Sequence, residues 1–399
     1  MNNEAIVEKL VRVGRASLIL GVVLLAAFFV SGPADKTAGS YLYGWTFWTC
    51  VALGMLGLTF LFQSIQAGWG RPLARLYEAG ASPATFIVLA LLFIPIVLNA
   101  GAIYEWVDAA KRSADPIMKG REPFMTPSAW GLRTAGYFLI WAIFAGLIRK
   151  WSVTEEKTGD PRLCNKRVNL SSAGLVLFVL TVTFAATDWI MSINTHWFST
   201  IYGAWFVVGT GLSAMSLGVF VVTRFGNEQP YRDALTPKMK NDWGNLMLMF
   251  TMLWAYTSLS QFLIIWAGNL PEFNPYYITR SQDGWNYIGI FTVVFQFFVP
   301  WVILFSPRVK KTTAYLGAVA AWIFFVRFFD VYWIVIPAAR PGASAVPQVS
   351  DFLAVAGIGA LFVGVWLTGM KGSILYPKYW NNRPKAFDAG APREAAEHA

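Results

Sequence analysis

Long apolar runs, separated by short polar connections, constrain this chain more than any other feature of its sequence. A helix needs about 20 apolar residues to cross the hydrocarbon core of a bilayer, and ten stretches reach roughly that length. They lie at approximately 15–31, 41–63, 82–103, 129–148, 170–193, 198–222, 243–268, 283–305, 313–336 and 351–370. Because backbone polar groups in lipid must be satisfied within the spanning element, these runs predict an all-α integral membrane protein with about ten transmembrane helices.

The composition agrees with lipid as the main solvent of this chain. Hydrophobic residues make up 56% of the 399 residues and charged residues only 14%, whereas soluble domains carry roughly 25% charged residues. The net charge of +10 does not indicate nucleic acid as a partner, because the basic residues lie in short loops between apolar runs. These basic residues are explained by their contact with anionic lipid headgroups and by their role in setting the orientation of the protein in the membrane.

Basic residues are distributed unevenly between the two sets of loops. The N-terminal flank, every second loop and the C-terminal tail hold 23 Lys and Arg residues, whereas the opposite loops hold 7. Cytoplasmic loops are enriched in Lys and Arg, so we expect both termini in the cytoplasm. We expect one membrane domain over 1–370, with the first run an uncleaved anchor, and a polar cytoplasmic tail over 371–399.

Ligands for redox metals are scarce. The chain has two Cys and two His residues, and one of these, His398, is the penultimate residue of the polar tail. There is no C-x-x-C-H haem attachment motif and no cysteine cluster. We therefore expect this chain to bind no haem, iron–sulfur cluster or other metal.

Ionisable residues inside a membrane are costly unless they have a partner or water, so each is a candidate site. Arg327 and Asp330 lie three residues apart in the ninth run, where one helical face carries both. They form either an ion pair that pins helices together or a proton- and quinol-handling site.

Asp188 and His196 lie near the outer end of the fifth run and in the short turn after it. A carboxylate and an imidazole near one interface suit proton-coupled redox chemistry, with one holding a hydroxyl and the other taking its proton. Helix capping and an interface position are the alternative for both residues.

The outer half of the seventh run carries a polar cluster that includes Tyr256, Ser258 and Gln261. Interhelical hydrogen bonding is the structural alternative to a binding role here. Arg133, near the outer end of the fourth run, is expected to extend towards the membrane surface.

These candidates gather on one side of the membrane. With both termini in the cytoplasm, the outer half or outer surface holds most ionisable and polar candidates: Glu105, Arg133, Asp188, His196, Gln261, Arg327, Asp330 and Asp351. The inner half of the helices is expected to be comparatively free of them, with Gln296 the main exception. Gly54, Gly57 and Gly364 are interpreted as packing positions.

Two segments resemble a known family. Residues 186–203 (ATDWIMSINTHWFSTIYG) and 253–271 (LWAYTSLSQFLIIWAGNLP) are similar to the second large membrane subunit of alternative complex III, the bacterial quinol:cytochrome c oxidoreductase. That subunit belongs with the polysulfide-reductase-type (NrfD-like) membrane proteins. The resemblance implies two four-helix bundles, helices two to five and six to nine, flanked by helices one and ten.

The resemblance also implies partners and ligands. The partners would be a sister NrfD-like ten-helix subunit, an iron–sulfur subunit and c-type haem subunits, together with lipid in the bacterial inner membrane. Menaquinone or ubiquinone would be the cofactor. Asp188, His196, Tyr256 and Gln261 lie in the matching segments and are carried over as candidate quinone or proton-path residues.

Three functions remain open from the sequence. The chain is either a quinol-oxidising membrane subunit, or a non-catalytic scaffold or proton-conducting subunit of the same complex, or an independent secondary transporter. Against a transporter, the sequence shows no clear internal repeat and no matched pair of Gly- or Pro-broken helices. Pro95 interrupts the third run, and the seventh has no proline.

Overall fold

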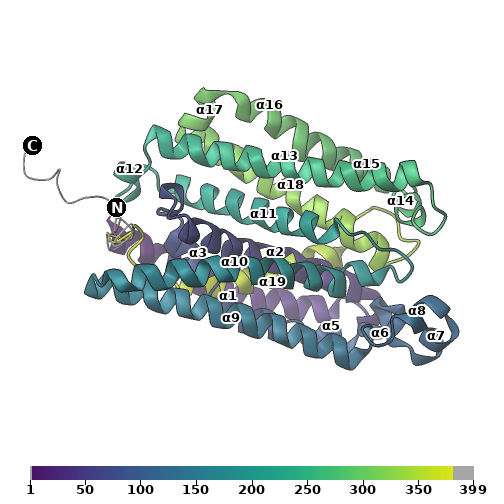
Figure 1. Cartoon of the computed structure of the whole chain (residues 1–399). Coiled ribbons are helices and arrows are strands. Elements are labelled where there is room, and N and C mark those ends of the chain that lie inside the picture. The colour runs from purple at the N-terminus through teal and green to yellow at the C-terminus, as the bar shows by residue number, and fades with distance from the viewer. Residues whose placement is uncertain (1, 381–399) are drawn as a thin grey trace, which may run out of the picture.

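The computed structural model describes residues 2–380, and these form helices and connecting turns without any strand (Figure 1). Ten helices or helical series in this part are long and apolar enough to cross a membrane. The all-α prediction is confirmed. The spans are α1 (Asn3–Val30), α2 (Ala34–Ser64), α3 to α5 (Ala74–Leu98), α9 (Pro127–Thr158), α10 (Pro161–Trp189) with its 3₁₀ turn η3 (Met191–Ile193), α11 (Tyr202–Arg224), α13 (Pro237–Gly268), α15 to α16 (Trp285–Phe305), α18 (Thr313–Ala339) and α19 (Val349–Thr368).

Proline and capping side chains start three of the longest helices. α9, α10 and α13 each have proline at the first helical position, preceded by Thr126, Asp160 and Thr236. Each of these side chains accepts a backbone N–H of the first turn, which would otherwise be unsatisfied. The helices consequently begin up to nine residues before the predicted spans, and α9 continues ten residues past its span, so much of the expected loop sequence is helical.

The ten spans form two four-helix bundles and one flanking pair. In the first bundle α2, the α3–α4 segment, α9 and α10 pack in a ring, and in the second α11, α13, the α15–α16 segment and α18 do the same. The bundles meet mainly where α11 packs on α2, and α1 pairs with α19 beside α2. The predicted arrangement is confirmed. Both bundles have the same helix order, although the sequence shows no internal repeat.

Small residues allow the closest helix approaches. A Cβ atom at Gly54 of α2 would lie 1.9 Å from the Thr210 carbonyl oxygen of α11, and one at Gly364 of α19 would lie 2.5 Å from Leu18 of α1. A Cβ atom at Gly57 would lie 2.6 Å from the Phe178 ring. The packing interpretation of all three glycines is confirmed.

Two spans are irregular. Pro95 has no N–H for the Leu91 carbonyl, and the third span breaks into α4 (Pro83–Leu91) and α5 (Ile94–Leu98), where Tyr41 donates to the Leu92 carbonyl. The eighth span contains a π-helical turn, η4 (Val293–Phe298), between α15 (Trp285–Thr292) and α16 (Val299–Phe305). Such wide turns occur often at functional sites.

The start and the end of the described chain lie at one end of the molecule. The Asn3 side chain donates to the Ser373 carbonyl, and the Trp380 indole donates to the Ala67 carbonyl. We call this the termini end, and the end that carries α7 (Ala109–Ala114), α8 (Pro116–Gly120) and α14 (Pro275–Thr279) the distal end (Figure 1). Residues 371–380 of the predicted tail pack on the termini end, and 381–399 lie outside the described residues.

Candidate functional site

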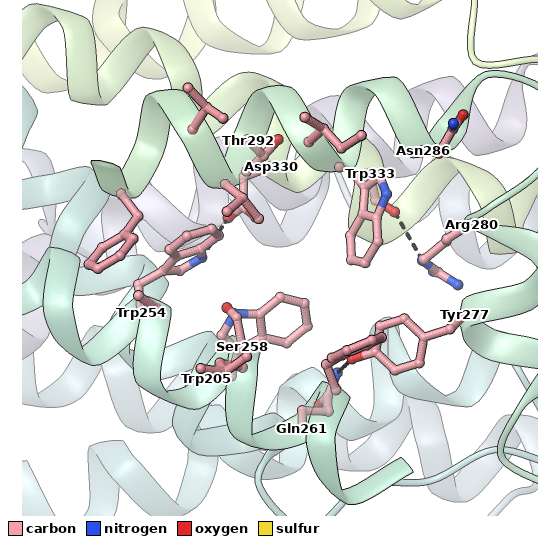
Figure 2. A pocket seen from close by; sticks show the side chains of 18 of the residues that line it. Trp205, Trp254, Ser258, Gln261, Tyr277, Arg280, Asn286, Thr292, Asp330 and Trp333 are labelled. Atoms are coloured by element: carbon pink, nitrogen blue, oxygen red, sulfur yellow. Dashed lines mark hydrogen bonds between the residues drawn. The ribbon is translucent and has the colours of Figure 1, made fainter. Parts of the chain in front are cut away.

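The second bundle contains a cavity of about 730 Å³ between α13, α14, α15, η4 and α18. Figure 2 shows the labelled side chains arranged around this space. Three of the side chains in its wall, Leu259, Ile290 and Phe298, are 57%, 60% and 48% exposed on the outer face of the bundle. That outer face is apolar and belongs to spanning helices, so this side of the cavity wall is the side expected to face lipid.

A buried ion pair borders this cavity. Arg327 and Asp330 of α18 form a salt bridge, and their side chains are only 3% and 2% exposed. The Trp254 indole of α13 donates to Asp330 at 3.2 Å, and Arg327 donates to the Ser213 hydroxyl of α11 at 3.0 Å. Asp330 lines the cavity, whereas Arg327 lies behind it.

Gly209 makes room for the guanidinium group. A Cβ atom at this position of α11 would lie 2.7 Å from Arg327 Nη2. Because α18 supplies the charges and α11 and α13 supply their partners, three helices must pack correctly before the pair is enclosed.

Several polar atoms in the cavity wall have no protein partner. Gln261 donates to the Tyr277 hydroxyl at 3.3 Å, but its own amide oxygen accepts nothing. The Ser258 hydroxyl and the Trp333 indole N–H are also buried without a partner among the described residues. Leaving such groups unpaired in an apolar environment costs about 1–3 kcal/mol each, so the wall is suited to a ligand or water that carries both donors and acceptors.

Arg280 adds a positive charge to the same wall. It is 3% exposed and donates to the carbonyls of Tyr276, Trp333 and Ile334, with no acidic partner within salt-bridge distance in the described chain. The Trp333 carbonyl is free to accept because Pro337, four residues later in α18, has no N–H.

Burial keeps the two tyrosines of α14 protonated. It raises the pKa of the Tyr277 phenol well above its ordinary value, and the neighbouring Tyr276 raises it further. The pKa of Tyr276 is also raised by burial, and the nearby Arg280 opposes that rise. Tyr277 therefore presents a hydroxyl donor to the cavity near neutral pH.

Asp188 lies in the first bundle, at the distal end of α10. Arg133 of α9 donates to both of its carboxylate oxygens, at 2.9 and 2.7 Å, and the Tyr137 hydroxyl donates at 2.8 Å. Arg133 also donates to the carbonyl of Phe124, in the connection before α9, at 2.7 Å, so its guanidinium lies towards the distal end, and its position relative to the membrane surface stays a prediction. Asp188 borders a second cavity, of about 510 Å³.

The other two predicted residues lie apart from both ion pairs. The His196 side chain is 51% exposed and contacts Asp115 at 2.9 Å, so its charged partner is not Asp188. Tyr256 is 66% exposed on the outer face of α13 and does not line the large cavity. Of the site residues predicted from the sequence, Asp330 and Gln261 line the same large cavity. Arg327 lies behind Asp330, outside the cavity wall.

The inner half of the predicted spans is expected to be comparatively free of ionisable groups, but the helices continue beyond those spans and carry buried ion pairs at the termini end. Arg75 pairs with Glu78 at 2.8 Å, and Arg167 pairs with Glu155, all four residues being at most 5% exposed. These residues fall in or beside the expected loops, but the helices extend through them and pack together. The sequence does indicate these ion pairs, because acidic residues lie close to the basic ones in both connections.

Comparison with protein-family models and with curated proteins gives no match for this chain. Among residues 2–380 no group of three or more His, Cys, Asp or Glu side chains is placed to hold a metal ion. The fold and the ten spans define the class: this is a multi-pass α-helical membrane protein.

Proposed function

We propose that this chain is a membrane subunit of a respiratory or photosynthetic quinol:cytochrome c oxidoreductase, and that the second-bundle cavity holds the quinol headgroup. One observation carries the proposal: the cavity wall reaches the apolar outer face of the bundle and also contains a carboxylate, a cation and unpaired polar atoms. A ligand that is dissolved in the bilayer and has a polar head requires this combination.

The polar groups of the wall suit a hydroquinone ring. Tyr277 would donate a hydrogen bond from its hydroxyl to one ring oxygen, and the amide oxygen of Gln261 would accept a hydrogen bond from a ring hydroxyl. In their mutual contact at 3.3 Å the Gln261 amide N–H donates to the Tyr277 oxygen. The tyrosine O–H and the glutamine amide oxygen therefore stay available to the ligand. Menaquinol and ubiquinol carry the same pair of ring hydroxyls, so the cavity suits either.

Asp330 would take up a proton. Quinol oxidation releases two protons and two electrons, and a carboxylate at the cavity wall is a suitable general base. Arg327, behind Asp330, holds the carboxylate in place at the cavity wall through their salt bridge. Arg280 would stabilise the negative charge that develops on the ring oxygen as its proton leaves.

The electrons would pass to metal centres in partner subunits. Two Cys and two His residues are too few for the haem or iron–sulfur groups that such a reaction needs. The proposed partners are the sister ten-helix subunit, an iron–sulfur subunit and c-type haem subunits. The excess of Lys and Arg in the loops of the termini end supports a bacterial inner-membrane protein whose distal end faces the periplasm.

A proton-conducting role is the second candidate. It is favoured by the buried Arg75–Glu78 and Arg167–Glu155 pairs at the termini end, which add ionisable groups at a second depth of the membrane. Under this alternative Glu155 would exchange protons with the cytoplasm, and the second-bundle cavity would hold no quinol.

Steady-state turnover of the assembled complex separates the two candidates. We expect Asp330→Asn to lower kcat at least about tenfold, the low end for loss of a general base, and Gln261→Leu to raise the quinol KM by about tenfold. Trp266→Phe is the matched control, since Trp266 lies on the same helix but is 69% exposed on its outer face.

The opposite pattern would reject the quinol site. If Asp330→Asn and Gln261→Leu assemble and turn over as the unmodified complex does, while Glu155→Gln slows proton uptake, the chain is a proton-conducting subunit. If all three substitutions leave both rates unchanged, scaffolding is the remaining role within the complex.

A further inference from the structure

The second cavity, in the first bundle, has a different chemistry from the first. Its volume is about 510 Å³, and it lies at the distal end beneath the connection that carries α8. Residues 120–125, the first turns of α9, the last turn of α10, and η3 with the turn that follows it supply most of its wall. Two of its lining residues, Phe124 and Phe198, are partly exposed at 37% and 48%.

The cavity carries an uncompensated positive charge. Asp188 already accepts three side-chain hydrogen bonds, two from Arg133 and one from Tyr137. Arg121, which also lines the cavity, donates to the Thr195 carbonyl at 2.6 Å and has no acidic partner within salt-bridge distance in the described chain. Two guanidinium groups and one carboxylate leave a net charge of +1 in the wall.

Further donors surround this charge. The indole N–H groups of Trp106 and Trp197 have no hydrogen-bond partner among the described residues, although these side chains are 1% and 3% exposed. The Asn194 side chain lines the same cavity. Phosphate oxygens are the acceptors that such a set of cations and neutral donors matches best.

The cavity also lies at the distal end of the spanning helices, next to the last turn of α10 and the first turns of α9. Lipid headgroups are expected near the ends of spanning helices. Leu132, beside Arg133 in the first turns of α9, is 77% exposed on the apolar outer face. A phosphate held by Arg121 would therefore leave acyl chains free to lie along α9.

We infer that this cavity binds the phosphate group of an anionic phospholipid from the leaflet at the distal end. The surplus positive charge excludes a cation as the ligand and favours an anion over a neutral quinol. Lipid is the proposed source because two aromatic lining residues, Phe124 and Phe198, are partly exposed beside the apolar outer face of α9, where they would contact the glycerol and upper acyl segments. The site is independent of the quinol proposal, since it uses the other bundle and none of its residues.

Native mass spectrometry of the full-length protein tests this inference. We expect delipidated protein titrated with phosphatidylglycerol to retain one lipid, and Arg121→Gln to weaken that retention at least about tenfold, as loss of a charge-assisted hydrogen bond would. Lys119→Gln is the control, because it removes the same charge two residues away at an exposed position outside the cavity. Arg121→Lys, which keeps the charge, should recover most of the binding.

Parallel titrations identify the source of the phosphate. Phosphatidylcholine should bind at least about tenfold more weakly than phosphatidylglycerol, and inorganic phosphate should displace the lipid only at much higher concentration. Thermal unfolding checks that the Arg121→Gln variant is folded. If the folded variant retains the lipid as well as the unmodified protein does, the proposed site is wrong. Displacement by inorganic phosphate at the concentration of the lipid would show a free-phosphate site instead, and an equal loss in Lys119→Gln would show non-specific attraction.

Discussion

At the scale of single residues, the buried charges are held by partners from neighbouring helices. Asp330 is contacted by Trp254 of α13, and Arg327 by Ser213 of α11. Removing one member of a buried pair leaves the other charge uncompensated, which costs more than the pair itself contributes. The two residues should therefore behave as a unit when they are substituted.

We expect Arg327→Ala and Asp330→Ala each to lower the free energy of unfolding by about 3–5 kcal/mol. The double substitution should cost less than the sum of the two single ones, by about 0.5–3 kcal/mol. Thermal unfolding of the protein in detergent measures all three. Glu8→Ala is the control, because its pair with Arg12 is exposed at both ends and should contribute nothing measurable. Additive costs would mean that the two charges do not interact.

At the scale of elements, helix contacts depend on where small residues fall. The α2–α11 contact joins the two bundles, and Gly54 brings the α2 backbone against the Thr210 carbonyl. In lipid the hydrophobic effect does not drive helices together, so such close backbone packing supplies much of the association.

Gly54→Ala should destabilise the protein by about 1–3 kcal/mol or more, because an added methyl group at 1.9 Å from a backbone oxygen must push α2 and α11 apart. Gly136→Ala, on the outer face of α9, meets no atom within 4 Å and should be neutral or slightly stabilising. Thermal unfolding compares the two. An unchanged midpoint for Gly54→Ala would mean that the bundles are joined elsewhere.

At the scale of the whole molecule, the chain places its described start and end on one face of the membrane. Ten spans require this, and the contact between Asn3 and residues 373–375 agrees with it. The loops of the termini end carry most of the Lys and Arg residues, which predicts that this face is the cytoplasmic one.

Cysteine labelling in intact cells tests that orientation. We expect a membrane-impermeant maleimide to label Lys119→Cys, at the distal end, and not Lys238→Cys, at the termini end. Both positions are exposed, and the two native cysteines, Cys50 and Cys164, are buried and give little background. Labelling of Lys238→Cys alone would place the termini end outside the cytoplasm and contradict the proposed orientation.

Part of the candidate site could be predicted from the sequence and part could not. The pairing of Arg327 with Asp330 follows from their spacing on one helix, which is a local property. The partners of Asp188 and Gln261 come from residues 51 to 55 and 16 positions away. No periodicity specifies such partners, so the pairing of Arg133 with Asp188 does not follow from the sequence, and neither does the outward orientation of Tyr256, which lies in the same polar cluster as Gln261 along the chain.

The sequence by itself determined the class of protein, the number of spans and the placement of both termini on one side. These properties depend on the length of each apolar run and on the charge of each loop. Both are local, because each segment meets the membrane independently of how the helices pack. Only the tertiary structure decided which helix faces meet, and with them the two cavities and the buried ion pairs at the termini end. The reason is that lipid tails are as apolar as the helix interfaces, so hydrophobicity alone does not tell an inward face from an outward one.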